Sequence, residues 1–182
     1  MTSGRIAVLL LVSSCVSMCV YAEDIRAKYA GRDSCTSELW GPVGNFGIRL
    51  DRSQRAYLAA HTVAGEKVLM IVQYAHDGDK CGVIKDVIAA AEAKSYFEFD
   101  CIDSTRPGTV VVGTWPDNNS GRTATALESW RVELETLTFA RATSKVICTR
   151  RGGSSVDRGE DLVGRAKMRA AKKKANKNVP EK

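Results

Sequence analysis

Residues 68–102 read VLMIVQYAHDGDKCGVIKDVIAAAEAKSYFEFDCI, and the fold is organised around this stretch. Residues 68–74 are few and dense in Val, Ile, Leu and Met, which favours a buried strand because helices usually need about ten or more residues. Asp77-Gly78 follows, a dipeptide typical of the two-residue turn of a β-hairpin, where both positions take positive φ. The stretch therefore predicts a buried strand after which the chain turns sharply back.

The segment that returns from this turn, residues 80–88, allows two interpretations. Its apolar residues fit one face of a helix, and the alanines at 89–91 favour that structure. Residues 96–102 (YFEFDCI) alternate as a strand does, so they could instead pair with residues 80–88 as a hairpin. We predict the hairpin, because the register that joins the apolar residues of the two segments also sets Cys101 opposite Cys81.

Residues 1–22 have the organisation of a signal peptide. Arg5 supplies the positive charge, residues 6–12 (IAVLLLV) form the apolar centre, and small residues precede a cleavage point after Ala22. Such a short apolar run cannot span a bilayer, which needs about twenty residues. A bacterial lipoprotein signal with acylation at Cys15 is the alternative. Both interpretations place the protein outside the cytoplasm, in the periplasm or secreted.

The mature chain would keep four cysteines, an even number that is typical of two disulfides in an exported protein. Their spacings contain no CxxC or CxxH pair, which argues against a metal site, and we predict no cofactor. The predicted hairpin selects the pair Cys81–Cys101 and leaves Cys35–Cys148 to join the two ends of the folded body. On the chain-entropy model each bridge contributes roughly 3 to 5 kcal/mol to stability.

The remainder of the body reads as short strands separated by turn residues. Residues 109–115 (TVVVGTW) are the clearest strand, since breaker residues flank them on both sides. Residues 56–63 allow helix or strand, and residues 127–137 allow a helical stripe or a hairpin, of which we prefer the hairpin. About eight short strands would then form one mainly β domain over residues 23–150, an antiparallel barrel or sandwich.

Charge divides the chain into a neutral body and a basic tail. Residues 151–182 carry ten Lys and Arg against four Asp and Glu, whereas residues 1–150 carry seventeen of each. The formal charge of +6 therefore lies wholly in the tail, so the body does not have the composition of a basic nucleic-acid-binding domain. Residues 161–175 are helix-prone, so we expect a basic helix or a disordered tail that makes little contact with the body. The candidate contacts to a polyanion or an anionic surface are Lys167, Arg169, Lys172, Lys173 and Lys174.

Two histidines are the candidates for a general base. His76 lies beside Asp77 and Asp79, a grouping that suits ligand contact, cation binding or proton transfer, although the same residues also serve simply as a turn. His61 stands in one of the ambiguous segments. The chain contains no hydrolase, zinc-protease or nucleotide-binding motif. Trp115 ends a predicted strand beside a polar loop, where an exposed ring could contact a ligand.

These features favour a noncatalytic, monomeric binding module of the cell envelope, comparable to inhibitor or immunity proteins. Its partner would be a protein or another envelope component and not a specific nucleic acid. One alternative is an envelope hydrolase that uses His61 or His76 with nearby carboxylates. Another is an envelope-structural protein that binds polyanions or anionic lipid through its basic tail.

Overall fold

The structure is a computed structural model that describes residues 25–35, 47–63, 65–77, 79–90, 95–116, 121–150 and 161–177. The predicted signal peptide and the start of the tail lie outside the described residues. A short helical segment occupies residues 25–29. The other elements are, in chain order, β1 (Gly47–Asp51), β2 (Ala56–Val63), β3 (Glu66–Gln73), β4 (Val83–Ala89), β5 (Ser95–Glu98), β6 (Cys101–Asp103), β7 (Val111–Pro116), β8 (Thr123–Thr125), β9 (Ser129–Glu133), β10 (Thr138–Arg141), β11 (Val146–Thr149) and α2 (Leu162–Lys177).

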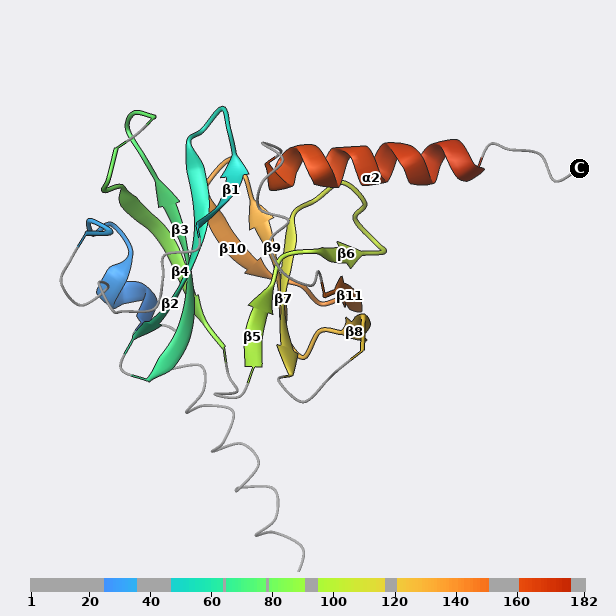
Figure 1. Cartoon of the computed structure of the whole chain (residues 1–182), viewed down its shortest axis with the longest axis horizontal. Coiled ribbons are helices and arrows are strands. Elements are labelled where there is room, and N and C mark those ends of the chain that lie inside the picture. Colours follow the sequence, from blue (N-terminus) through green and yellow to red (C-terminus); the bar gives the residue numbers. More distant parts are fainter. Residues whose placement is uncertain are drawn as a thin grey trace, which may run out of the picture.

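The strands form three antiparallel sheets. Sheet A has the order β1-β2-β3-β4, sheet B the order β10-β9-β7-β5, and sheet C the order β6-β11-β8. Figure 1 shows sheets A, B and C side by side from left to right, with residues 25–29 outside sheet A. The prediction of a mainly β, antiparallel fold is confirmed, with eleven strands instead of about eight. The strand orders give three separate sheets, so the expected antiparallel barrel or sandwich describes the fold only loosely.

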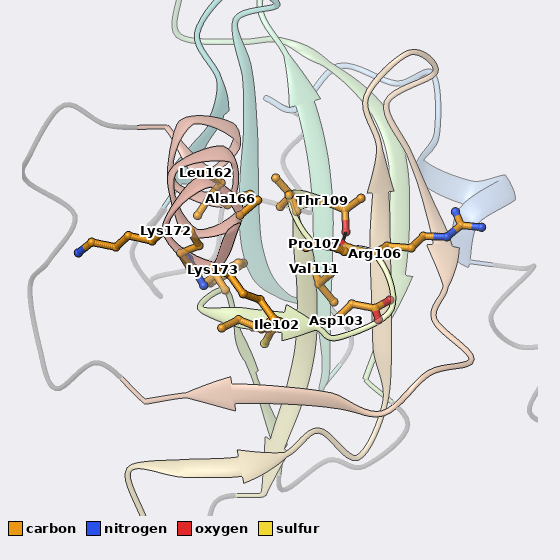
Figure 2. Close-up of a pocket in the computed structure, with 16 residues that line it drawn as sticks. Ile102, Asp103, Arg106, Pro107, Thr109, Val111, Leu162, Ala166, Lys172 and Lys173 are labelled. Carbon is orange, nitrogen blue, oxygen red and sulfur yellow. Dashed lines mark hydrogen bonds between the residues drawn. The ribbon is translucent and has the colours of Figure 1, made fainter. Parts of the chain in front are cut away.

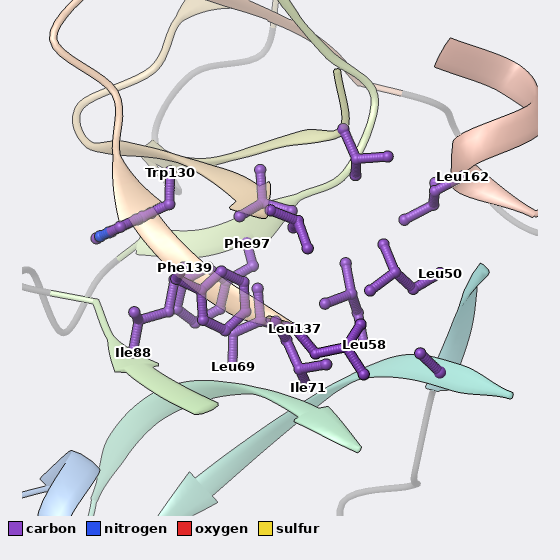
Figure 3. Packing of buried hydrophobic residues seen from close by; sticks show 14 of the residues in the cluster. Leu50, Leu58, Leu69, Ile71, Ile88, Phe97, Trp130, Leu137, Phe139 and Leu162 are labelled. Atoms are coloured by element: carbon purple, nitrogen blue, oxygen red, sulfur yellow. The ribbon is translucent and has the colours of Figure 1, made fainter. Parts of the chain in front are cut away.

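The main core lies between sheets A and B. β3 is an inner strand of sheet A, and its residues 68–72 are all buried. Leu69 and Ile71 point toward sheet B, where they meet Phe97 and Phe139 (Figure 3). The alternate residues of the same run face the other side of the sheet. Because both faces of β3 are buried, nearly all of its residues are apolar. Such a continuous apolar run is a clear sign of a buried strand in the sequence.

The outer face of sheet A is covered by the helical segment 25–29. Ile25 and Tyr29 pack there against residues of β3 and β4. Arg26 forms an ion pair with the buried carboxylate of Asp86 in β4. The same carboxylate accepts a hydrogen bond of 2.7 Å from the backbone N–H of Phe139 in β10. One side chain therefore joins the N-terminal segment to both large sheets.

Sheet C covers the outer face of sheet B. Val111 and Trp115 of β7 pack with Cys101 and Cys148 in a separate apolar cluster. The Cys101–Cys148 disulfide joins neighbouring strands, since the two residues are register partners in β6 and β11. Gly113 of β7 leaves room for this bridge, because a Cβ at that position would lie 2.7 Å from the Cys148 Sγ. Sheet B is therefore packed on both faces.

α2 lies across one end of the stacked sheets (Figure 1). Leu162 and Val163 are buried in the main core. The Asp161 carboxylate caps the helix by accepting a hydrogen bond from the backbone N–H of Gly164 (2.7 Å). Its other oxygen accepts one from the backbone N–H of Arg52 (2.9 Å), which ties the start of the helix to the end of β1. Of the two alternatives for the tail, a basic helix or a disordered segment, the structure has the helix over Leu162–Lys177. The expectation that the tail makes little contact with the body is wrong, because apolar side chains of the first helical turn close the end of the core.

The predicted hairpin within the central stretch is also wrong. Residues 80–88 do contain a strand, β4, but it pairs with β3 and not with residues 96–102. The latter divide between β5 in sheet B and β6 in sheet C. The backbone N–H and C=O groups of buried β3 need hydrogen-bond partners along both edges of the strand. β2 pairs with one edge, and β4, the next strand in the chain, pairs with the other. The connection from β3 to β4 spans residues 74–82, longer than the two-residue turn predicted at Asp77-Gly78.

The four cysteines form two disulfides as predicted, but the pairs are Cys35–Cys81 and Cys101–Cys148. The predicted pairs depended on the hairpin, which does not form. Cys81 instead precedes β4, at the place where Asp33 makes a bridge to that strand. The pairs are separated by 46 and 47 residues, so the chain-entropy model assigns each of them roughly 4 kcal/mol.

The other two ambiguous segments are strands. Residues 56–63 form β2, whose last residue Val63 pairs with Glu66 of β3, and Gly65 just before β3 has φ +85°. Residues 127–137 contain β9 and the turn into β10, as the hairpin interpretation predicts. In both segments, pairing with a neighbouring strand decides between the two periodicities.

Candidate functional site

A cleft opens between α2 and the loop at residues 104–110, which joins β6 to β7 (Figure 2). Its volume is about 240 Å³. Three elements build it: α2 forms one wall, the loop forms the opposite wall, and the ends of β6 and β7 form the floor. The lining combines apolar side chains at the bottom with basic side chains at the edge.

The apolar part of the cleft is continuous with the main core. Leu162 and Ala166 of α2 are core residues that also line the cleft, together with Val110. Toward the outside the apolar surface continues over Ile102, which is 47% exposed, and its cross-strand partner Ile147, which is 48% exposed. Exposed apolar surface beside polar residues is typical of an interaction site.

Four cations line the cleft, and three of them have no ion pair with a residue that the structure describes. Arg169 forms an ion pair with Asp100. Arg106, Lys172 and Lys173 line the cleft without an ion pair to any residue that the structure describes. Figure 2 shows Lys172 and Arg106 extending outward on opposite sides of the cleft. The edge of the cleft therefore carries three positive charges that the described body does not compensate.

Asp103 is the acidic residue of the lining, and the protein holds it ionised. Burial by itself would raise the pKa of Asp103, but hydrogen bonds to its carboxylate, including one of 2.6 Å from the Thr105 hydroxyl, lower this pKa to about 2. Its other oxygen lies 3.6 Å from the Arg131 guanidinium of β9. The Asp103 carboxylate thus joins sheets B and C and is already engaged with protein groups, so it does not cancel the cations at the edge.

The loop opposite α2 is shaped by local backbone contacts. Asp103 accepts a hydrogen bond of 2.8 Å from the backbone N–H of Thr105, and the Thr109 hydroxyl donates to the carbonyl of Arg106 at 2.8 Å. Gly108 has φ +92°, a backbone conformation that favours glycine. A Cβ at this position would lie 3.5 Å from Ala170 of α2, so loop and helix are close enough to bound a narrow cleft.

The predicted ligand contacts lie elsewhere. Trp115 is fully buried between sheets B and C, so the expectation of an exposed ring is wrong. The physical reason is the strand alternation, which turns Trp115 to the same face of β7 as buried Val111. His76 is exposed, with 83% of its side chain accessible, and its backbone N–H donates to Asp79 at 2.7 Å. Asp77 is exposed in the same turn.

The two histidines are not brought together. His61 lies in β2 opposite Val68, near the start of β3, whereas His76 follows the end of β3. The strand therefore separates them along most of its length, and neither lines the cleft. The two imidazoles therefore cannot act together on one substrate bound in the cleft.

The cations predicted to contact a polyanion divide into two groups. Arg169, Lys172 and Lys173 line the cleft, while Lys167 and Lys174 are exposed elsewhere on α2. Reasoning from sequence missed the opposite wall, which consists of Arg106 and its neighbours. The local signal there was the Pro107-Gly108 breaker, which predicts a turn but not its contact with α2.

Comparison with known proteins finds no matching family model, no similar curated protein and no similar solved structure. Across the described ranges no helix has the length and apolar character needed to cross a bilayer. The two disulfides indicate an oxidising environment.

Proposed function

We propose that this protein is an exported, noncatalytic binding module whose recognition surface is the cleft between α2 and residues 104–110. The observation that carries this proposal is an apolar floor together with three cations at the edge that have no ion pair among the described residues. A concave, mostly apolar pocket that has a few charged groups around it is the default candidate for a binding site. The cell envelope is the proposed location, because the N-terminal pattern and the two disulfides both favour an oxidising compartment.

The size of the cleft favours recognition of part of a larger partner. Pockets that enclose a complete small ligand usually measure about 300 to 1,000 Å³. An apolar cavity of about 150 Å³ holds a molecule the size of benzene. At about 240 Å³, the cleft therefore suits one large apolar side chain or group, the kind of anchor that dominates protein interfaces.

The hydrolase alternative has less support in this geometry. A general base must reach the bound substrate within hydrogen-bond distance, and both histidines lie away from the cleft. Asp103 lines the cleft, but a carboxyl with a pKa of about 2 is a weak base at neutral pH. We therefore keep the binding role as the main proposal.

The test is capture of a partner from the secreted or periplasmic fraction, identified by mass spectrometry and repeated with variants. Ala170→Trp fills the cleft from α2, while the double variant His61→Gln/His76→Gln leaves the cleft intact. We expect the first variant to lose the partner and the second to retain it. Loss of the partner or of activity in the folded histidine variant alone would instead favour the hydrolase.

A further inference from the structure

We infer that the cleft binds a segment of an acidic protein partner, in which one apolar side chain enters the cleft and neighbouring carboxylates contact its basic edge. This inference rests on the proposed function, since it names the occupant of the same cleft. It follows from the charge of the edge, the shape of the cleft and the exposed apolar surface beside it.

Charge complementarity is the first argument. Along the stripe of α2 that faces the body, Leu162 and Ala166 are followed by Arg169 and Lys173, spaced by four, three and four residues. The stripe thus changes from apolar to cationic along the helix. The opposite wall adds a further cation, Arg106, from the loop at residues 104–110. Of these cations, only Arg169 has a carboxylate partner among the described residues. The edge therefore attracts a partner that supplies carboxylates.

The concave shape argues against a flat anionic membrane as the occupant. A bilayer surface cannot enter a narrow cleft between a helix and a loop, whereas a protruding side chain can. The exposed apolar residue of α2, Met168, lies about 240° around the helix from Leu162. Met168 therefore does not point into the cleft with Leu162, and it is not among the lining residues.

The apolar surface beside the cleft argues for a macromolecule over a small amphiphile. Ile102 borders the cleft, and its cross-strand partner Ile147 lies farther out on sheet C. A short acyl chain that filled the 240 Å³ of the cleft would leave Ile147 exposed. A protein segment anchored in the cleft would cover both isoleucines, which matches an interface with an apolar centre and a polar rim.

The experiment uses the oxidised chain, expressed with its own N-terminal segment, and follows backbone amides by ¹H–¹⁵N NMR. The probe is the peptide acetyl-Asp-Glu-Phe-Glu-Asp-amide, with two matched peptides in which Gly replaces Phe or Lys replaces all four acids. We expect the probe to shift the amides of Ile102, Gly108 and Ala170, which line the cleft. Both matched peptides should bind about tenfold more weakly or not at all.

Two double variants separate local recognition from overall charge. Lys172→Glu/Lys173→Glu reverses the two lysines of the cleft, and Lys167→Glu/Lys174→Glu makes the same charge change on exposed positions of the same helix. We expect the first variant to weaken peptide binding about tenfold at low salt and the second by less than about threefold. Equal losses in both variants would overturn the inference, because binding would then follow net charge alone.

Other occupants are separate outcomes of the same titration. If octanoate, phosphatidylglycerol vesicles or a second copy of this chain shifts the amides of the cleft and the acidic peptide does not, the inference is overturned while the proposed function stands. If no probe shifts the amides of the cleft and the Ala170→Trp variant still captures the natural partner, the inference and the proposed function are both wrong. Equal binding of the peptide that lacks Phe would also contradict the inference, since no apolar anchor would be needed.

Discussion

Leu162→Ala tests whether α2 is part of the folded body. Leu162 lies in the first turn of the helix and is 4% exposed. Figure 3 shows it among core residues, on the side of Leu50, which is fully buried in β1. The substitution removes apolar contact at the end of the core while leaving the helix and its cap at Asp161 in place.

The expected loss follows from the burial of this side chain. Leu→Ala substitutions in a core cost about 2 to 5 kcal/mol, and the lower half of that range applies where the site can relax. Leu162 lies at the edge of the core beside the cleft, so we expect about 2 to 3 kcal/mol. For a domain of this size, that loss lowers the melting temperature by about 4 to 12 °C.

The assay is thermal unfolding followed by circular dichroism, with urea unfolding as an independent measurement of the free energy. Met168→Ala is the matched control, because Met168 lies on the same helix but is 51% exposed. Its expected effect is within about 0.5 kcal/mol, as for most surface substitutions. Native spectra of both variants at low temperature would show that the helix itself is retained.

Equal melting temperatures for Leu162→Ala, Met168→Ala and the wild type would refute this reasoning. The tail would then be independent of the body, and the cleft would lose one of its walls. Removal of residues 161–182 should lower the melting temperature as well, because it exposes the core surface that Leu162 and Val163 cover.

Three further predictions concern the body. Gly113→Ala should destabilise the protein by about 1 to 3 kcal/mol in urea unfolding, because the added Cβ meets the Cys148 sulfur; an unchanged midpoint would contradict this packing. Because the pKa of Asp103 is lower in the folded protein than its ordinary value of 3.8, its ionised form stabilises the fold at pH values above 3.8. This stabilisation is lost as the pH falls through about 2. The stability gap between wild type and Asp103→Asn should therefore shrink by about 2 kcal/mol between pH 6 and pH 2, and a constant gap would exclude this contribution. Nonreducing peptide mapping should recover Cys35 joined to Cys81, and recovery of either cysteine joined to Cys101 would contradict the layered fold.

Local patterns in the sequence predicted most of the individual strands. The apolar run at 68–72 and the flanked segment at 109–115 predicted β3 and β7, because burial on both faces requires continuous apolar residues. Even cysteine number predicted two disulfides, and helix-forming residues after Asp161 predicted α2. These features depend on composition and spacing over a few residues, so they are readable without knowledge of distant contacts.

Pairing between distant segments was not readable in the same way. Residues 80–88 and 96–102 satisfy a plausible hairpin register, yet β4 joins sheet A while β5 and β6 join sheets B and C. The same error carried over to the disulfides, since their prediction depended on that register. Strand alternation shows that two faces differ, but it does not show which other sheet covers each face, so Trp115 was expected at the surface.

The sequence by itself determined the mainly β character of the body, the number of disulfides, the basic helix and the neutral charge of the rest. Only the tertiary structure decided that α2 closes the core and that Lys172, Lys173 and Arg106 line one cleft. The reason is that secondary structure and net charge arise from neighbouring residues, whereas a cleft arises from segments that are far apart in the chain. Residues 104–110 and α2 meet because the burial of Leu162 and Val163 fixes the helix against the end of the sheets.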